Sequence, residues 1–233
     1  MHVLITRPEP DASKLAAQLR ALGHTPILEP LLSITYEPGE PVNLLGAQAV
    51  LITSANGVRS LALRTKERAM LVLCVGAASA EAARAEGFTD VRSADGDVHA
   101  LAALVQQQCL PEKGLLLHVA GTVVAGDLAG LLTKAGYTVD RQALYAAHVR
   151  DELTSEARAA LECGGVDAVL LFSPRTAKTF AKLVCDAHLE GACEGLPLLC
   201  LSQAVADELG ALSGAELQVA KTPDTAALLE LLT

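Results

Sequence analysis

The chain has 233 residues, 51% of them hydrophobic, and a formal net charge of −9. With 18 Lys and Arg residues and 3% aromatic residues, it lacks the basic surface and stacking platforms that a nucleic-acid binder needs. No apolar run reaches the roughly 18 residues of a membrane span, and the start lacks a signal-peptide pattern. We therefore expect a cytoplasmic protein with neither nucleic acid nor membrane as a partner.

Short apolar runs alternate with amphipathic stretches along the chain. The first group is a strand at 3–6, a helix from about Leu15 to Leu22 that stops at Gly23, a strand at 25–29 and an extended segment at 31–36. Further strands are predicted at 49–52, 70–75, 89–92, 115–119, 138–145, 168–172, 198–201 and 217–220. Nearly continuous apolar strands joined by helices are typical of parallel sheets covered on both faces, so the predicted fold class is α/β.

Several segments recur in the same order further along the chain. Leu15–Gly23 returns as Leu128–Gly136, Ala49–Ser54 as Ala168–Ser173, and Leu73–Val75 as Leu199–Leu201. A separation that grows only slowly indicates a duplicated unit, too long for a solenoid repeat. We therefore predict two similar lobes, each a parallel sheet flanked by helices, with a ligand between them, because concave sites favour domain interfaces.

The duplication leaves the pairing of the pieces open. The first strand-helix-strand of each copy could stay with its own copy or be exchanged with the other. Segments 31–36 and 144–149 hold equivalent positions in the two copies, and each is a candidate hinge strand between the lobes.

Small and hydroxylated residues follow four predicted strands, at the edge where α/β proteins bind ligands. The candidate binding residues in these loops are Ser54, Asn56, Ser79, Ser173, Arg175, Thr176 and Ser202. Backbone N–H groups at helix starts could hold carboxylates there, although Ser, Thr and Asn are also the usual helix caps. Arg7, after the first strand, could pair with a carboxylate. Tyr145 lies on the second hinge segment, where its hydroxyl could donate a proton or its ring could cover the hinge.

The sequence contains no dinucleotide or Walker motif, and its six histidines are scattered without metal-ligand spacing. We therefore expect no cofactor and no metal. The six cysteines form no CxxC pair and are interpreted as reduced thiols. Cys74 and Cys200 are repeat equivalents, which leaves open a cofactor-free racemase with one thiol in each lobe. A two-lobed protein that binds a small molecule without catalysis is the other alternative.

Five segments resemble those of uroporphyrinogen-III synthases, in the same order and over essentially the whole chain. They are Val3–Pro8, Thr53–Val58, Val75–Ala80, Val139–Tyr145 and Phe172–Pro174. The resemblance implies exchanged lobes, residues 1–34 with 148–233 and residues 35–147. It also implies a lyase that uses no cofactor and cyclises hydroxymethylbilane to uroporphyrinogen III, with inversion of ring D and loss of water. We expect a monomer, and the preceding deaminase is a candidate partner.

Residue by residue, the resemblance gives Tyr145 the role of assisting loss of the hydroxyl. Ser54 and Ser173 fall on two serine loops, and Ser79 falls where the family commonly has threonine. Two loops depart from the family pattern. Val205 stands at a threonine position in loop 202–206, and loop 120–126 lacks an arginine that many members carry, so ligand contacts in that second loop would come from the backbone or be absent.

Overall fold

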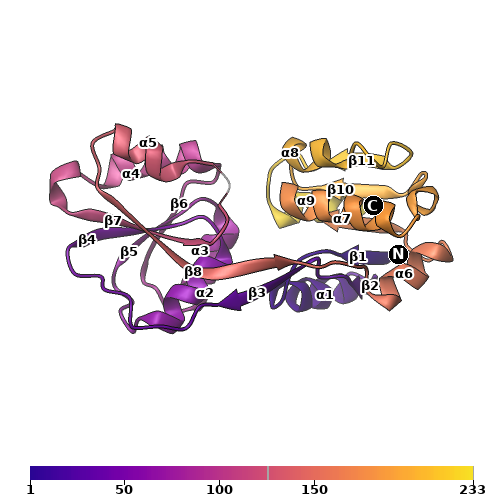
Figure 1. Cartoon of the computed structure of the whole chain (residues 1–233), viewed down its shortest axis with the longest axis horizontal. Coiled ribbons are helices and arrows are strands. Elements are labelled where there is room, and N and C mark those ends of the chain that lie inside the picture. The colour runs from indigo at the N-terminus through magenta and orange to yellow at the C-terminus, as the bar shows by residue number, and fades with distance from the viewer. Residues whose placement is uncertain (125, 233) are drawn as a thin grey trace. The chain divides into compact units, whose positions relative to one another are not determined.

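The computed structural model describes residues 1–124 and 126–232. The chain divides into two compact units (Figure 1). Unit 1 comprises Met1–Ser33 and His148–Thr233, and unit 2 comprises Ile34–Ala147. Each unit is a sheet of mainly parallel strands with helices on both faces, which confirms the predicted α/β class with two similar lobes.

Unit 1 contains a five-stranded parallel sheet in the order β11-β10-β9-β1-β2. Its strands are β1 (His2–Ile5), β2 (Thr25–Leu28), β9 (Ala168–Leu171), β10 (Pro197–Cys200) and β11 (Glu216–Val219). The first strand-helix-strand of the chain thus pairs with strands that lie more than a hundred residues later. The exchange that the repeat left open is present.

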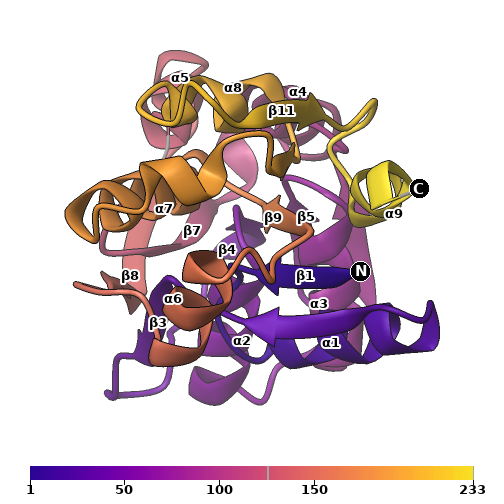
Figure 2. The same cartoon turned by 90° about the vertical axis from the view of Figure 1, so that its right-hand side faces the viewer.

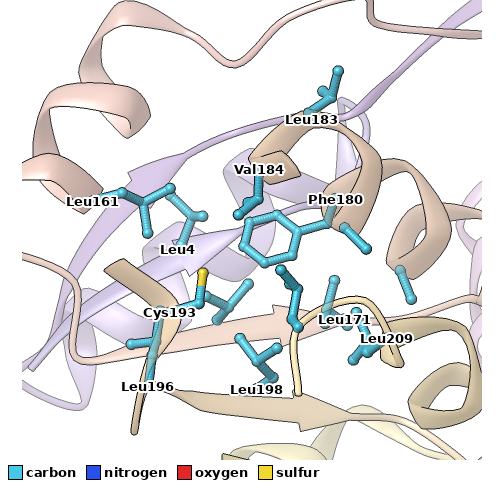
Figure 3. Close-up of a cluster of buried hydrophobic side chains, with 14 of the residues drawn as sticks. Leu4, Leu161, Leu171, Phe180, Leu183, Val184, Cys193, Leu196, Leu198 and Leu209 are labelled. Carbon is cyan, nitrogen blue, oxygen red and sulfur yellow. The ribbon is translucent and has the colours of Figure 1, made fainter. Parts of the chain in front are cut away.

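Helices cover both faces of this sheet because neighbouring side chains on a strand point to opposite faces (Figure 2). Leu4 and Leu171 face α6 (Ser155–Glu162), α7 (Pro174–Asp186) and the short α8 (Gln203–Ala206). Val3, Ile5 and Leu170 face α1 (Asp11–Ala21) and α9 (Thr225–Leu229). Phe180 of α7 is fully buried at the centre of the first of these clusters (Figure 3).

Unit 2 contains a six-stranded sheet in the order β3-β8-β7-β4-β5-β6. Its strands are β3 (Leu32–Tyr36), β4 (Ala47–Ile52), β5 (Leu71–Cys74), β6 (Asp90–Ser93), β7 (Leu115–Gly121) and β8 (Val139–Val149). On one face lie α2 (Ala55–Arg64) and α3 (Ala77–Ala85), and on the other lie α4 (Val98–Gln108) and α5 (Leu128–Lys134). When the sheet of unit 2 is taken from its other edge, the order β6-β5-β4-β7-β8 corresponds strand by strand to β11-β10-β9-β1-β2 in unit 1.

Two strands carry the chain across the division between the units. The Glu37 N–H donates to Leu144 O at 2.9 Å, and the Arg150 N–H donates to Leu31 O at 3.0 Å, so β3 and β8 run in opposite directions. The predicted strand at 138–145 and the candidate hinge strand at 144–149 are one long strand, β8. It is long because its first half pairs with β7 and its second half with β3.

No helix in the described ranges 1–124 and 126–232 is both long and apolar enough to cross a membrane. Short 3-10 turns occur at Pro111–Lys113, Glu190–Cys193, Asp207–Leu209 and Glu230–Leu232.

Candidate active site

A pocket of about 440 Å³ opens at the carboxyl ends of the unit 2 strands. Its described lining residues are Thr53, Ser54, Val75, Asp97, Val98, Gly121, Val123, Val124, Gly126 and Tyr145. They come from segments at or after the ends of β4, β5, β6 and β7, and from β8. Parallel strands end at a common edge, so residues far apart in sequence meet there.

Tyr145 and Ser54, both predicted from the sequence, meet in this pocket. Their hydroxyl oxygens are 2.7 Å apart, and the Tyr145 side chain is otherwise buried. Ser54 also caps α2, because its Oγ accepts a hydrogen bond from the Gly57 N–H at 3.2 Å. With Oγ accepting from Gly57, the Ser54 proton can go to Tyr145 Oη. That arrangement leaves the phenol proton of Tyr145 for a ligand in the pocket.

Gly121 fixes the place of the Tyr145 ring, a role that the sequence did not reveal. A Cβ atom at Gly121 would lie 2.9 Å from Cε2 and Cζ of that ring. The two residues are partners in the register between β7 and β8. A side chain at position 121 would therefore push the phenol away from Ser54.

Asp97 is the charged residue among the described lining residues of the pocket. It caps α4, with Oδ1 accepting from the N–H groups of His99 at 2.9 Å and Ala100 at 3.0 Å. These bonds, that of Ala100 most strongly, lower the pKa of Asp97 below its usual 3.8. The group is therefore a carboxylate at neutral pH.

The remaining walls of the pocket are largely apolar. Val75 and Val98 line it, together with Val123 and Val124, which are 64% and 41% exposed. Val123 and Val124 belong to the loop that departs from the family pattern, and so do Gly121 and Gly126. Ala125, in the same loop, lies outside the described residues. In this chain the loop therefore contributes apolar side chains to the pocket and not the arginine of the family pattern.

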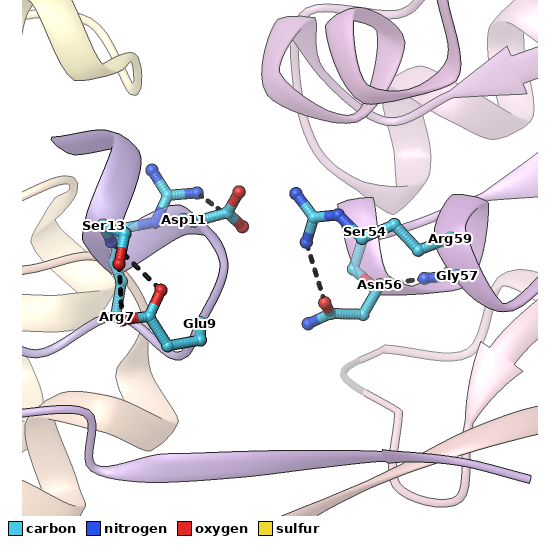
Figure 4. A network of polar contacts seen from close by, with 8 residues as sticks. All are labelled: Arg7, Glu9, Asp11, Ser13, Ser54, Asn56, Gly57 and Arg59. Atoms are coloured by element: carbon cyan, nitrogen blue, oxygen red, sulfur yellow. Dashed lines mark hydrogen bonds and ion pairs between the residues drawn. The ribbon is translucent and has the colours of Figure 1, made fainter. Parts of the chain in front are cut away.

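Unit 1 presents a different arrangement at the ends of β1 and β9. The guanidinium carbon of Arg7 lies 4.6 Å from the centroid of the Phe172 ring, and its Nη2 lies 3.5 Å from a carboxylate oxygen of Asp11 (Figure 4). Ser173 caps α7 by accepting from the Thr176 N–H at 3.2 Å, and the hydroxyls of Ser173 and Thr176 are also hydrogen bonded. Arg175, in the first turn of α7, is half-buried.

Three other predicted residues lie outside the described lining of the pocket. Asn56 accepts a hydrogen bond from Arg59 at 3.0 Å within α2 (Figure 4). Ser79, in the first turn of α3, is 6% exposed. Ser202 precedes α8 without a side-chain cap bond. The structure therefore brings together Ser54 and Tyr145, and the other three are not among the described lining residues of their pocket.

The two cysteines of the racemase alternative are fully buried strand residues. Burial raises the pKa of Cys74 to about 12 and that of Cys200 to about 11. A thiol of this kind is inert at neutral pH, because the thiolate is the reactive form. Within residues 1–124 and 126–232, no three His, Cys, Asp or Glu side chains are grouped closely enough to hold a metal ion.

Comparison with known proteins agrees with this arrangement. A crystal structure of a mutant uroporphyrinogen III synthase from Thermus thermophilus has a TM-score of 0.58 and 20% identity, covering 100% of this chain and 97% of that one. A uroporphyrinogen-III synthetase from Helicobacter pylori has a TM-score of 0.64 and 18% identity, covering 99% and 97%. These likenesses show the fold. No curated protein matches the chain.

The family model described as uroporphyrinogen-III synthase HemD matches residues 13–230, nearly the full length of the chain and both of its units. The chain therefore belongs to the uroporphyrinogen-III synthase family of enzymes.

Proposed function

We propose that the protein cyclises hydroxymethylbilane to uroporphyrinogen III, with inversion of ring D and loss of water. The observation that carries this proposal is the Tyr145 hydroxyl, held 2.7 Å from Ser54 Oγ in an apolar pocket. A hydroxyl leaves carbon readily only when it gains a proton, and a phenol held by a neighbouring hydroxyl is suited to donate one. Membership of the family supports the same reaction.

The first step breaks the bond between the terminal methylene carbon and its hydroxyl oxygen. Electrons from the adjacent pyrrole expel the oxygen, Tyr145 donates its proton to it, and water leaves. The products of this step are the phenolate of Tyr145 and an azafulvenium cation, which keeps its N–H. A carbon of ring D then attacks its methylene, ring D inverts, and the macrocycle closes with release of a proton that can restore Tyr145.

Much of the rate advantage comes from holding the two ends of a flexible chain together, since the attacking pyrrole carbon is already nucleophilic. The polyacidic substrate also needs cations. Arg7, in the loop after β1, and Arg175, in the first turn of α7, are the residues of unit 1 that we assign to its carboxylates. A cation held against Phe172, as Arg7 is, loses less freedom when it binds an anion.

The proposal is tested by incubating the purified protein with hydroxymethylbilane, oxidising the products and separating the porphyrin isomers. We expect isomer III, against isomer I in the control without protein. Isomer I alone would overturn the proposal. A protein that only binds tetrapyrroles would also give the isomer ratio of the control.

Tyr145→Phe tests the proton donor. We expect kcat to fall about 100-fold with little change in KM, because general-acid catalysis is worth roughly that factor. Tyr137→Phe is the matched control. Tyr137 also lies buried in unit 2, but its hydroxyl donates to Cys109 O at 2.9 Å and lies outside the described lining of the pocket. Equal activities of the two variants would contradict the role of Tyr145.

A further inference from the structure

The pocket around Tyr145 has a charge opposite to what a carboxylate-binding site requires. Asp97 is ionised and lines it, and no Lys or Arg is among its described lining residues. Asp97 is exposed, so solvent weakens its field, but a substrate carboxylate beside it would still meet a like charge with no cation among the described lining residues to offset it, which is unfavourable. The carboxylate-bearing edges of the substrate therefore bind elsewhere, and the pocket receives another part of the molecule.

A carboxylate in an apolar pocket is suited to accept a hydrogen bond from a neutral ring N–H. Within residues 1–124 and 126–232, both helix N–H groups that reach Asp97 bond to Oδ1, which leaves Oδ2 to a ligand. The valines offer contact to the face of a flat ring. A pyrrole has these two features, an apolar face and a single N–H donor on its edge.

Resting on the proposed function, we propose that this pocket binds the pyrrole ring that carries the hydroxymethyl group, with its N–H donating to Asp97 and its hydroxyl oxygen facing Tyr145. Asp97 is then a catalytic residue. It fixes the orientation of the ring that reacts, and Tyr145 supplies the proton that the same ring's hydroxyl needs.

The charges of the first step fit this placement. As the carbon–oxygen bond breaks, the pyrrole nitrogen supplies the electron pair and becomes positively charged while still bearing its proton. The oxygen leaves as water with the proton of Tyr145. The positive charge thus develops on the N–H that faces Asp97, where a carboxylate stabilises the transition state more than the ground state.

Asp97→Asn separates this role from helix capping. Asparagine keeps an oxygen for the cap of α4 but loses the charge and can place an N–H where Oδ2 was. We expect kcat/KM for isomer III to fall about 100-fold. Asp224→Asn is the matched control, because Asp224 caps α9 in unit 1 by the same bond, from the Ala227 N–H at 2.9 Å. We expect Asp224→Asn to retain wild-type turnover.

A second readout does not depend on turnover. Pyrrole and N-methylpyrrole are titrated separately into isotopically labelled protein, and the amide resonances of Gly121 and Tyr145 are followed by NMR. We expect pyrrole to shift them in the wild type, and N-methylpyrrole, which has no N–H, to shift them several-fold less. In Asp97→Asn the difference between the two ligands should disappear.

The outcomes separate the two proposals. A wild type that makes isomer I alone overturns the proposed function, whatever the titration shows. A wild type that makes isomer III, with Asp97→Asn as active as Asp224→Asn, overturns the role of Asp97 and leaves the function standing. Equal shifts by pyrrole and N-methylpyrrole would likewise overturn N–H recognition.

Discussion

The two units share one strand order, yet equivalent positions at the strand ends carry different chemistry. Ser173 in unit 1 and Ser54 in unit 2 cap equivalent helices. In unit 1 the serine hydroxyl bonds to Thr176 of its own helix, whereas in unit 2 it bonds to Tyr145 on β8. Duplication thus supplies two similar caps, and the phenol that we propose as the proton donor is hydrogen bonded to the cap of unit 2.

Charge differs between the copies in the same way. Alignment of Leu15 with Leu128 puts Arg7 opposite Ala120, and Ile5 opposite His118. Unit 1 therefore has a cation after β1, while the corresponding end of β7 has the small residues Ala120 and Gly121, and the Tyr145 ring lies close to Gly121. We infer that unit 1 supplies charge for carboxylates and unit 2 holds the reacting ring.

The largest expected effect comes from giving unit 2 a side chain where it has none. Gly121→Ala would place Cβ 2.9 Å from the Tyr145 ring, so the ring must move away from Ser54. A displacement of about 1 Å can cost about 100-fold in rate. We expect kcat for isomer III to fall by that factor, measured by the isomer assay.

Gly210→Ala serves as the control for that variant. Position 210 has helical backbone angles, and nothing lies within 4 Å of a Cβ there. We expect it to be as active as the wild type. Wild-type activity in Gly121→Ala as well would mean that the phenol position does not matter to catalysis.

The second prediction concerns the substitution His118→Ile. It gives β7 the residue that β1 has at the equivalent position, Ile5. His118 is 3% exposed, and neither ring nitrogen has a hydrogen-bond partner in the described part of the chain. Burial, and to a lesser degree Arg141, lowers the pKa of His118 from 6.5 to about 4. Between those values the unfolded chain binds a proton that the folded chain does not, so stability falls on acidification.

At roughly 1.4 kcal/mol per pKa unit, the wild type loses about 2 kcal/mol of its free energy of unfolding on acidification to pH 5. His118→Ile should remove this loss. At pH 7 it should also stabilise unit 2 by about 1 kcal/mol, because an unpartnered buried group is gone. Urea unfolding followed by circular dichroism at pH 5 and pH 7 measures both. His99→Gln, at an exposed position, is the control. An unchanged pH dependence in His118→Ile would contradict the assignment.

The third prediction compares the two equivalent caps. Ser54→Ala and Ser173→Ala should each cost about 1 kcal/mol of stability through the lost cap. Ser54→Ala should in addition lower kcat about 10-fold, because Tyr145 loses the hydroxyl that orients it. Ser173→Ala should leave kcat near the wild-type value. Ser54→Thr, which keeps a hydroxyl, should restore most of the turnover, and equal kcat values in the two alanine variants would contradict the comparison.

The sequence predicted the α/β class, the duplication and the strands, because continuous apolar runs and glycine stops are local signals. It also singled out Ser54 and Tyr145, but it could not show that their hydroxyls meet, since that contact depends on the pairing of β7 with β8. Asp97 and Gly121 were missed. Asp97 is an ordinary cap in sequence, and the need for glycine at position 121 comes from a ring that lies on the neighbouring strand.

The smallest expected effect concerns the cation of unit 1. Arg7→Gln should raise KM for hydroxymethylbilane about 5-fold and leave kcat nearly unchanged, because the ion pair of a partly buried Arg7 with a substrate carboxylate contributes on the order of 1 kcal/mol to binding. Raising the salt concentration should weaken binding by the wild type more than by the variant, since screening acts on the pair that the variant lacks. Arg158→Gln is the control, because Arg158 is exposed on α6 and pairs with Glu162 at 2.9 Å. If Arg7→Gln lowered kcat and left KM alone, Arg7 would act on the reacting ring, and the inferred division of labour between the units would be wrong.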